Sequence, residues 1–178
     1  MEQNLTFADL GLSPEILRAL EQKGYGYPTR IQAEAIPPFM EWKDVIAKAP
    51  TGTGKTYAFG IPMIEHIDAA REDLQGLILA PTRELAIQIA DELRALLAFY
   101  KNIRVAVLYG GQKIDVQLKA LARKPQIVVA TPGRLMDHYN RHSIRFDKIE
   151  TVILDEADRM LDMGFFQDVT KILDKIKN

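Results

Sequence analysis

One glycine-rich stretch combines the residue types that bind phosphate. Ala49–Thr56 reads A-P-T-G-T-G-K-T and follows the apolar run Val45–Ala47, which we expect to be a buried strand. A glycine-rich turn between a strand and a helix directs several backbone N–H groups at one point, at the positive end of the helix dipole. In the pattern G-x-x-x-x-G-K-[ST], the lysine reaches the β- and γ-phosphates and the hydroxyl binds Mg²⁺. The stretch therefore predicts a nucleotide-binding loop with Lys55 and Thr56 in these roles, although Ala49 stands at the first glycine position.

Two adjacent acids supply the second part of a site that cleaves phosphate. Asp155 and Glu156 follow the apolar run Thr151–Leu154, which we expect to be a strand. One carboxylate can hold the Mg²⁺ that bridges the phosphates, and the other can accept a proton from the attacking water. Acids also favour a helix N-terminus through its dipole, but that alternative does not predict a phosphate loop upstream. Together the two stretches predict a hydrolytic site in which they face each other across a magnesium-bound triphosphate.

Composition limits the class of protein. The chain has 178 residues, of which 47% are hydrophobic and 26% charged, and this predicts one globular domain with a sizeable core. It has no cysteine, no apolar run that could span a bilayer and no signal peptide, so we expect a cytoplasmic protein without disulfides or thiolate-bound metal. The formal net charge of −1 gives no support for nucleic-acid binding, so any basic surface must be local.

The elements that position these residues alternate between helix and strand. Strands are expected at 45–47, 76–80, 104–109, 127–130 and 151–154. Helices are expected at 14–23, 30–40, after Thr56, 85–100, 112–122, from Pro132 and from 165 onward. Continuous apolar strands are typical of a parallel sheet with helices on both faces, so the fold class is α/β. Each polar or glycine-rich cluster follows a strand, and the carboxyl ends of parallel strands meet at one ligand-binding edge.

Thr29 and Gln32 permit two interpretations. Their T-x-x-Q spacing predicts a capping box that opens a helix running to about Met40. Alternatively, the Gln32 amide, with one acceptor and two donors, can read the edges of an adenine. The residues alone favour the cap, and one amide cannot serve both partners fully. The histidines at 66, 138 and 142 form no recognisable group, so surface or helix positions are expected, and Trp42 is expected to pack.

Asp155–Asp158 read D-E-A-D, and here the chain resembles the DEAD-box RNA helicases. Other blocks match that family in the same order: Phe7 twenty-five residues before Gln32, A-P-T-G-T-G-K-T at 49–56, P-T-R-E-L at 81–85, G-G at 110–111 and T-P-G-R at 131–134. The resemblance covers essentially the whole chain. It implies a RecA-like P-loop domain over residues 1–178, the first of such a helicase, with a Q-motif region at 1–43.

The resemblance implies an ATP and Mg²⁺ site. Gln32 would read adenine, which makes the nucleotide ATP rather than GTP, and this overrides the preference for a cap alone. The other nucleotide-binding residues would be Phe7, Tyr25, Thr29, Thr51, Gly52, Thr53, Gly54, Lys55 and Thr56. Asp155 would coordinate Mg²⁺ through water, and Glu156 would activate the hydrolytic water.

The resemblance also implies RNA as a partner, bound through its backbone with little sequence preference. The RNA-facing residues would be Pro81, Thr82, Arg83, Gly111, Thr131, Gly133 and Arg134, although Arg83 could instead support the site from behind. The family carries a Ser-Ala-Thr strand, whose hydroxyls would bond Asp158, and a second RecA-like domain; neither is in this sequence. In the family that strand lies between the phosphate-loop strand and the D-E-A-D strand, so its absence would leave two strand edges exposed.

The implied function is the ATP-binding half of an RNA helicase, which couples ATP binding and hydrolysis to RNA clamping and local unwinding, without a membrane. The alternative is a nucleotide- or RNA-binding module with no turnover in this form.

Overall fold

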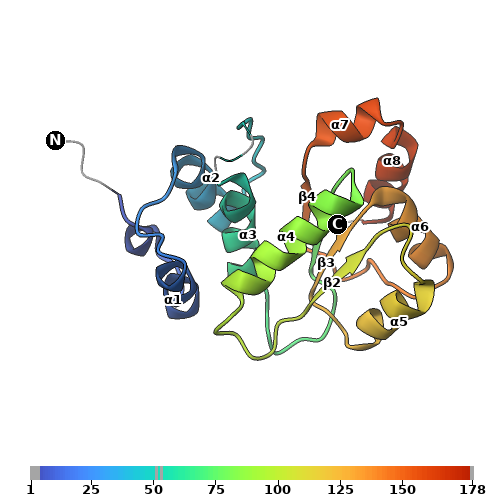
Figure 1. Cartoon of the computed structure of the whole chain (residues 1–178), viewed down its shortest axis with the longest axis horizontal. Coiled ribbons are helices and arrows are strands. Elements are labelled where there is room, and N and C mark those ends of the chain that lie inside the picture. Colours follow the sequence, from blue (N-terminus) through green and yellow to red (C-terminus); the bar gives the residue numbers. More distant parts are fainter. Residues whose placement is uncertain (1–4, 51, 53, 177–178) are drawn as a thin grey trace. The chain divides into compact units, whose positions relative to one another are not determined.

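The structure, a computed structural model, describes residues 5–50, 52 and 54–176 (Figure 1). The chain forms two compact units. Unit 1 runs to Ile67 and includes Glu92–Lys101, whereas unit 2 consists of Asp68–Asp91 and the chain from Asn102 onward. No helix in the described ranges is both long enough and apolar enough to cross a membrane.

Unit 1 is helical, and its helices at Pro14–Gln22 and Arg30–Met40 lie where the sequence predicts them. It contains the 3₁₀ turn η1 (Phe7–Leu10), α1 (Pro14–Gln22), α2 (Arg30–Met40), α3 (Lys55–Glu65) and the last turn of α4 (Arg83–Leu96). Ser13 caps α1 by accepting a hydrogen bond from the Ile16 N–H, and Gly24 follows the helix with a φ of +78°. The apolar stripe of α1 packs inward, since Ile16 and Leu20 are fully buried.

Pro62 lies inside the third helix without ending it. α3 continues to Glu65, and the His66 N–H donates to the Pro62 carbonyl. Pro37 and Pro38 lie inside α2 in the same way. A proline removes one N–H donor from the helical ladder, and the buried apolar face of α3, which includes Ile61 and Met63, holds the remainder in place.

The expected strand at Val45–Ala47 is wrong. Residues 43–50 have no regular secondary structure, Val45 is 36% exposed, and the Ile46 side chain is 96% exposed. A strand is stable only when neighbouring strands satisfy its backbone N–H and C=O groups. Among the described residues no strand pairs with this run, so its apolar side chains remain outside any core.

Unit 2 is built on a four-stranded parallel sheet with the order β2-β3-β1-β4. Its strands are β1 (Gly76–Leu79), β2 (Val105–Leu108), β3 (Ile127–Ala130) and β4 (Thr151–Leu154), which confirms the other four predicted strands. Leu77 lies in register with Val128 on one side and Val152 on the other. β4 has one strand neighbour, so one of its edges is open within the described part of the chain.

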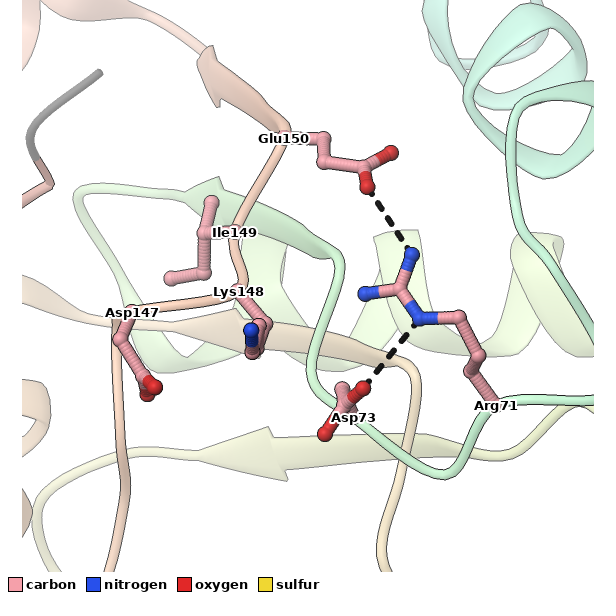
Figure 2. A pocket seen from close by; sticks show the side chains of 6 residues that line it. All are labelled: Arg71, Asp73, Asp147, Lys148, Ile149 and Glu150. Atoms are coloured by element: carbon pink, nitrogen blue, oxygen red, sulfur yellow. Dashed lines mark hydrogen bonds and ion pairs between the residues drawn. The ribbon is translucent and has the colours of Figure 1, made fainter.

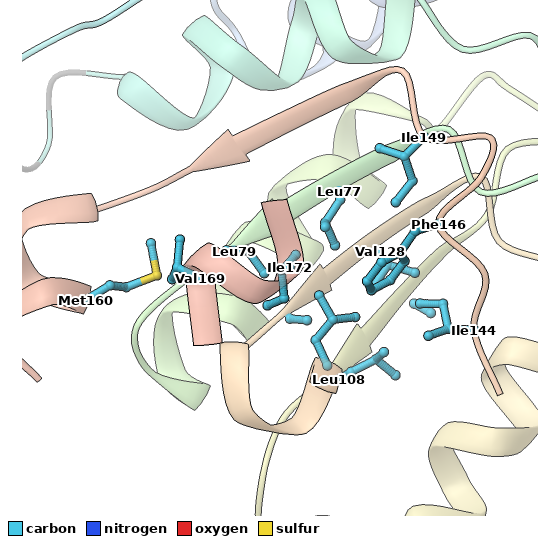
Figure 3. Packing of buried hydrophobic residues seen from close by; sticks show 13 residues of the cluster. Leu77, Leu79, Leu108, Val128, Ile144, Phe146, Ile149, Met160, Val169 and Ile172 are labelled. Carbon is cyan, nitrogen blue, oxygen red and sulfur yellow. The ribbon is translucent and has the colours of Figure 1, made fainter. Parts of the chain in front are cut away.

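The helices of unit 2 are α5 (Ile114–Ala122), α6 (Pro132–Asn140), α7 (Ala157–Asp162), α8 (Phe166–Lys175) and the first turns of α4. The short α7 was not expected from the sequence. Alternate strand residues such as Leu77 and Leu79 point to one face of the sheet, where Met160, Val169 and Ile172 cover them (Figure 3). This buried apolar layer holds the strands in place, and it thereby fixes the position of the loop that follows each strand.

Candidate functional site

The phosphate-type loop leads directly into α3. Gly54 is the residue before the helix, with a φ of +81°, and Gly52 has a φ of +85°. L-residues rarely adopt this left-handed conformation, so glycine at both positions allows the tight path. Lys55 and Thr56 are the first two residues of α3 and therefore lie at the positive end of its dipole. The expected contributions of Thr51 and Thr53 fall outside the described residues.

Gln32 closes over this loop within unit 1. Its Oε1 accepts a hydrogen bond from the Thr29 N–H at 2.9 Å, and its Nε2 donates to the Gly54 carbonyl at 3.0 Å. The Gln32 N–H donates to the Thr29 hydroxyl, which completes the predicted capping box. The amide thus keeps one N–H and one lone pair beyond these bonds, while the residue is only 4% exposed.

The aromatic candidates of unit 1 differ in accessibility. Tyr25 is 49% exposed and meets Tyr57 edge to face, with 5.9 Å between ring centroids. Phe7 is buried, and its N–H donates to the Gly26 carbonyl at 3.5 Å. Of these rings, Tyr25 therefore presents the surface that a base could reach.

Trp42 does not pack in a core, although packing was expected. It stacks on His66 with 3.6 Å between ring centroids, yet it remains 56% exposed.

The acid pair lies at the carboxyl end of β4. The Asp155 N–H donates to the Leu79 carbonyl at 3.0 Å, which extends the ladder with β1 by one residue, and Asp155 is only 5% exposed. Glu156 adopts the left-handed conformation, with a φ of +51°, and is the residue before α7, where its side chain makes no capping bond. Its Oε2 pairs with Arg159 Nη1 at 3.2 Å. Asp158 is exposed and accepts a hydrogen bond from the Arg159 N–H.

The carboxylates fit a magnesium ion that is completed by a ligand. The described residues contain no group of three or more acidic, histidine or cysteine side chains that could hold a metal ion by themselves. Mg²⁺ usually keeps several waters and binds through one or two carboxylates together with substrate phosphates. Asp155, buried at a strand end, has the oxygen chemistry of such a partial site.

The loops that follow β1, β2 and β3 carry the expected RNA-facing residues, and these strands are neighbours in the sheet. Arg83, exposed at the start of α4, lies over the Tyr109 ring with its Cζ 5.2 Å from the ring centroid. A Cβ added to Gly111, whose φ is +94°, would lie 3.7 Å from Arg83 Nη1. The structure therefore brings Arg83 and the turn at Gly110-Gly111 together at one edge.

Two further members of this set lie on elements as predicted. Thr82 accepts a hydrogen bond from the Leu85 N–H and opens α4 directly after Pro81. Thr131 is the residue before α6, and its hydroxyl makes no capping bond. Pro132 supplies the first helical position, where no N–H is needed. The exposed Gly133 follows at the start of α6.

Arg134 is anchored by residues that sequence reasoning missed. Its Nη1 donates to the Gln112 carbonyl at 3.1 Å and to Gln117 Oε1 at 3.2 Å. His138 lies in α6, one of the two positions expected for the histidines, but it is fully buried and contacts the same Gln117 oxygen. The signal available in the sequence was spacing: Arg134 and His138 stand four apart and therefore share one face of α6.

A hollow of about 410 Å³ lies at the opposite end of the strands (Figure 2). Arg71 pairs there with Asp73 at 3.2 Å and with Glu150 at 3.1 Å. These bonds raise the pKa of the Arg71 guanidinium, with the bond to Glu150 contributing most. Because Asp73 precedes β1 and Glu150 precedes β4, this hollow is at the amino edge of the sheet, away from the acid pair.

A glycine-rich loop that opens a helix, and a parallel α/β sheet with an acid pair at its carboxyl edge, are features of the class of P-loop nucleotide-binding proteins. Comparison with known proteins narrows this class. The family model described as DEAD/DEAH box helicase matches residues 29–178. The chain belongs to the DEAD/DEAH box helicase family.

Curated relatives support this assignment. The chain is 49% identical over 168 residues to the DEAD-box ATP-dependent RNA helicase CshA of Bacillus cereus, covering 94% of this chain and 32% of the relative. It is 51% identical to the ATP-dependent RNA helicase CshA of Limosilactobacillus reuteri, covering 95% of this chain and 34% of the relative. The chain therefore spans about a third of the length of these relatives.

Solved structures show the same fold. A DEAD box protein from the hyperthermophile Methanococcus jannaschii matches with a TM-score of 0.91 and 46% identity, covering 97% of this chain and 47% of that one. A hypothetical ATP-dependent RNA helicase from Sulfolobus tokodaii matches with a TM-score of 0.85 and 37% identity, covering 92% of this chain and 47% of that one. The fold is thus that of the RecA-like domains of DEAD-box proteins.

Proposed function

We propose that this chain is the ATP-binding half of an RNA helicase, in which ATP binding and hydrolysis drive RNA clamping and local unwinding. One observation supports this above the others. Within unit 2, Asp155 and Glu156 end β4 at the same sheet edge as the loops that carry Arg83, Gly111 and Arg134. A change at the acids on hydrolysis can therefore be transmitted to the RNA-facing loops through one rigid sheet.

The proposed hydrolysis assigns one task to each residue. Lys55 would neutralise the β- and γ-phosphates, and Thr56 and Asp155 are the residues that would hold Mg²⁺, which would supply charge stabilisation for the phosphoryl transfer. Glu156 accepts the proton of the attacking water. Its ion pair with Arg159 holds the carboxylate on the α7 side.

The proposed adenine recognition uses what remains of the Gln32 amide. One N–H and one lone pair suffice for the two bonds that distinguish adenine from guanine, and the exposed Tyr25 ring can stack on the base. Thr29 and Phe7 support these two residues, through the capping box and by packing, and make no polar contact with the base.

The proposed RNA site contacts the backbone. Pro81, Thr82, Thr131 and Gly133 offer hydroxyls or close backbone approach at helix N-termini, and Arg83 and Arg134 supply charge. A second RecA-like domain is the proposed partner in the whole protein, and Asp158, exposed on α7, is the proposed coupling residue. Because RNA is the partner, we place this activity in the cytoplasm.

The catalytic assignment is tested with Glu156→Gln in a protein that joins this chain to the C-terminal part of a CshA relative. RNA-stimulated ATP turnover should fall about 10²–10⁴-fold, because the general base is lost, while ATP binding is retained. Glu150→Gln is the matched control, since Glu150 precedes the same strand at the opposite edge and should leave turnover unchanged. Unchanged turnover in the Glu156 variant would refute the assignment of the base.

Nucleotide choice is tested by equilibrium binding of ATP and GTP to the chain. ATP should bind more tightly, and Gln32→Ala should reduce the ratio of the two affinities toward one. Equal affinities in the unmodified chain would remove the adenine-reading role of Gln32.

A second candidate is a binding module that does not turn ATP over. The two candidates differ in one measurement: the joined protein hydrolyses ATP with RNA stimulation in the first case, and binds both ligands without hydrolysis in the second.

A further inference from the structure

Gln117 of α5 lies at the centre of a buried polar network in unit 2. The residue is 1% exposed, and its amide makes four hydrogen bonds. Nε2 donates to the Tyr109 carbonyl at 2.8 Å and to Gln112 Oε1 at 3.0 Å. Oε1 accepts from Arg134 Nη1 at 3.2 Å and from His138 Nε2 at 2.7 Å. The side chain is thus bonded to its full capacity for a buried amide.

These bonds fix the direction of the amide. Its NH₂ group faces two oxygens and its oxygen faces two N–H donors, so an exchange of the two ends would place like groups together. His138 Nε2 must carry a proton, because the amide oxygen only accepts. His138 Nδ1 lies 2.8 Å from the Ser143 hydroxyl, whose single proton can be donated either to Nδ1 or to the His138 carbonyl, 3.0 Å away. Both ring nitrogens therefore lie within hydrogen-bond distance of a polar side chain.

The bonds of Gln117 tie together two segments that are separate in sequence. Tyr109 and Gln112 flank the turn at Gly110-Gly111 after β2, whereas Arg134 lies in the first turn of α6 after β3. Arg134 Nη1 also donates to the Gln112 carbonyl, so turn and guanidinium are held both directly and through Gln117. These bonds use Nη1, Nε lies 4.0 Å from Asp137 Oδ2, and 17% of the Arg134 side chain remains exposed.

We propose that Gln117 is a positioning residue for RNA binding, which holds the Gly110-Gly111 turn and the Arg134 guanidinium in one fixed arrangement. This inference rests on the proposed function, in which both segments contact the RNA backbone. Gln117 itself is buried beneath them and touches no RNA.

The chain contains a matched control for this idea. Gln126 is fully buried in the same unit and makes three hydrogen bonds: its Oε1 accepts from the Arg104 N–H at 2.9 Å, and its Nε2 donates to the carbonyls of Asn102 at 2.7 Å and Arg71 at 3.2 Å. It directly precedes β3, at the amino edge of the sheet. Gln117→Leu and Gln126→Leu each remove a buried amide, but only the first lies beneath the RNA-facing loops.

The experiment measures the binding of a fluorescently labelled single-stranded oligouridine to the chain by anisotropy at low salt. Gln117→Leu should weaken RNA binding about tenfold, because a misplaced arginine loses its phosphate contact. Its affinity for ATP should be unchanged. The RNA affinity of Gln126→Leu should stay within about twofold of that of the unmodified chain in the same assay.

Gln117→Glu is the conservative variant. A carboxylate still accepts from Arg134 and His138 but cannot donate to Tyr109 or Gln112, so only the turn is released. RNA affinity should be intermediate, and the charge should raise the pKa of His138 as followed by NMR. If Gln117→Leu does not fold, the RNA affinity of Gln117→Glu tests the positioning role in its place.

Two results would overturn the inference: a folded Gln117→Leu variant with unchanged RNA affinity, or an equal loss in Gln126→Leu, which would show an effect of stability alone. If the unmodified chain binds no RNA, the proposed function fails, and the amide NMR signals of Gly111 and Gly133 then decide the positioning role. Those signals should move in Gln117→Leu and not in Gln126→Leu, and unmoved signals would refute the role.

Discussion

At the scale of single residues, the bond between Gln32 and Gly54 joins two stretches that look independent in the sequence. The capping box uses the Gln32 oxygen, and the phosphate loop takes the amide nitrogen. A capping residue and a loop glycine are thus parts of one structure, so a change at either should affect nucleotide binding through the other.

Alanine substitutions at Gly52 and Gly54 separate the cost of backbone strain from the cost of losing the contact with Gln32. Gly52→Ala should cost about 1–2 kcal/mol, because an L-residue enters the left-handed region with open space around it. Gly54→Ala should cost about 1 kcal/mol more, because the new Cβ overlaps Gln32 Nε2 and breaks the bond to the Gly54 carbonyl. Urea unfolding measures both, and equal losses would show that the Gln32 contact contributes nothing.

His138 should make the stability of the chain depend on pH. Burial lowers the pKa of its imidazole, and the nearby Arg134 and, more weakly, Arg141 lower it further, whereas Asp137 opposes them. The folded state then binds fewer protons than the unfolded state, so stability is complete above the unfolded pKa of about 6.5 and is lost as pH falls through it.

Urea midpoints between about pH 5.5 and 7.5 measure this dependence. The unmodified chain should lose stability toward the acidic end, and His138→Gln should flatten the profile. His142→Gln, at an exposed position, should keep the slope. A slope that persists in the His138 variant would assign it to other groups.

At the scale of elements, the strand ends of unit 2 do most of the positioning. Four strands in one parallel register place four loops at one edge, and the apolar layer under Met160 and Ile172 holds them there. The run at Val45–Ala47 shows the opposite case, in which a strand-like sequence has no sheet to hold it among the described residues. It has the composition of a strand but lacks a paired neighbour in the described chain, and it is exposed.

Ile46→Asp tests that exposure. Because the side chain is 96% exposed, the substitution should change the free energy of unfolding of this chain by less than about 0.5 kcal/mol. Ile78→Ala, in the fully buried β1, is the comparison and should cost about 2–5 kcal/mol. A large loss at Ile46 would show that this run is buried in solution.

At the scale of the whole molecule, the charge is nearly balanced, with 23 basic and 24 acidic side chains. The proposed RNA binding would therefore depend on a few local cations and on uncharged backbone donors. This differs from a protein that binds nucleic acid through a broad basic surface, and the difference appears in the salt dependence.

The logarithm of the RNA affinity should fall with the logarithm of salt concentration with a slope of about −1 to −2, since each neutralised phosphate contributes about −0.7. Arg83→Ala should reduce the steepness by about 0.7. Arg145→Ala removes an exposed arginine that pairs with Asp147 and should leave the slope unchanged. A steep slope that is insensitive to Arg83 would place the RNA elsewhere.

The sequence by itself determined the alternation of helix and strand in unit 2, the capping box of α2, and the placement of the acid pair and the RNA-facing clusters after strands. These features depend on local patterning and on short motifs, which act within a few residues of one another.

Tertiary structure decided the rest. The exposure of Ile46, the burial of His138, the closure of Gln32 over Gly54 and the four bonds of Gln117 all depend on partners that are distant in the chain. A strand needs a neighbour and a buried polar group needs a hydrogen-bond partner, and sequence spacing does not specify which distant residue will provide it.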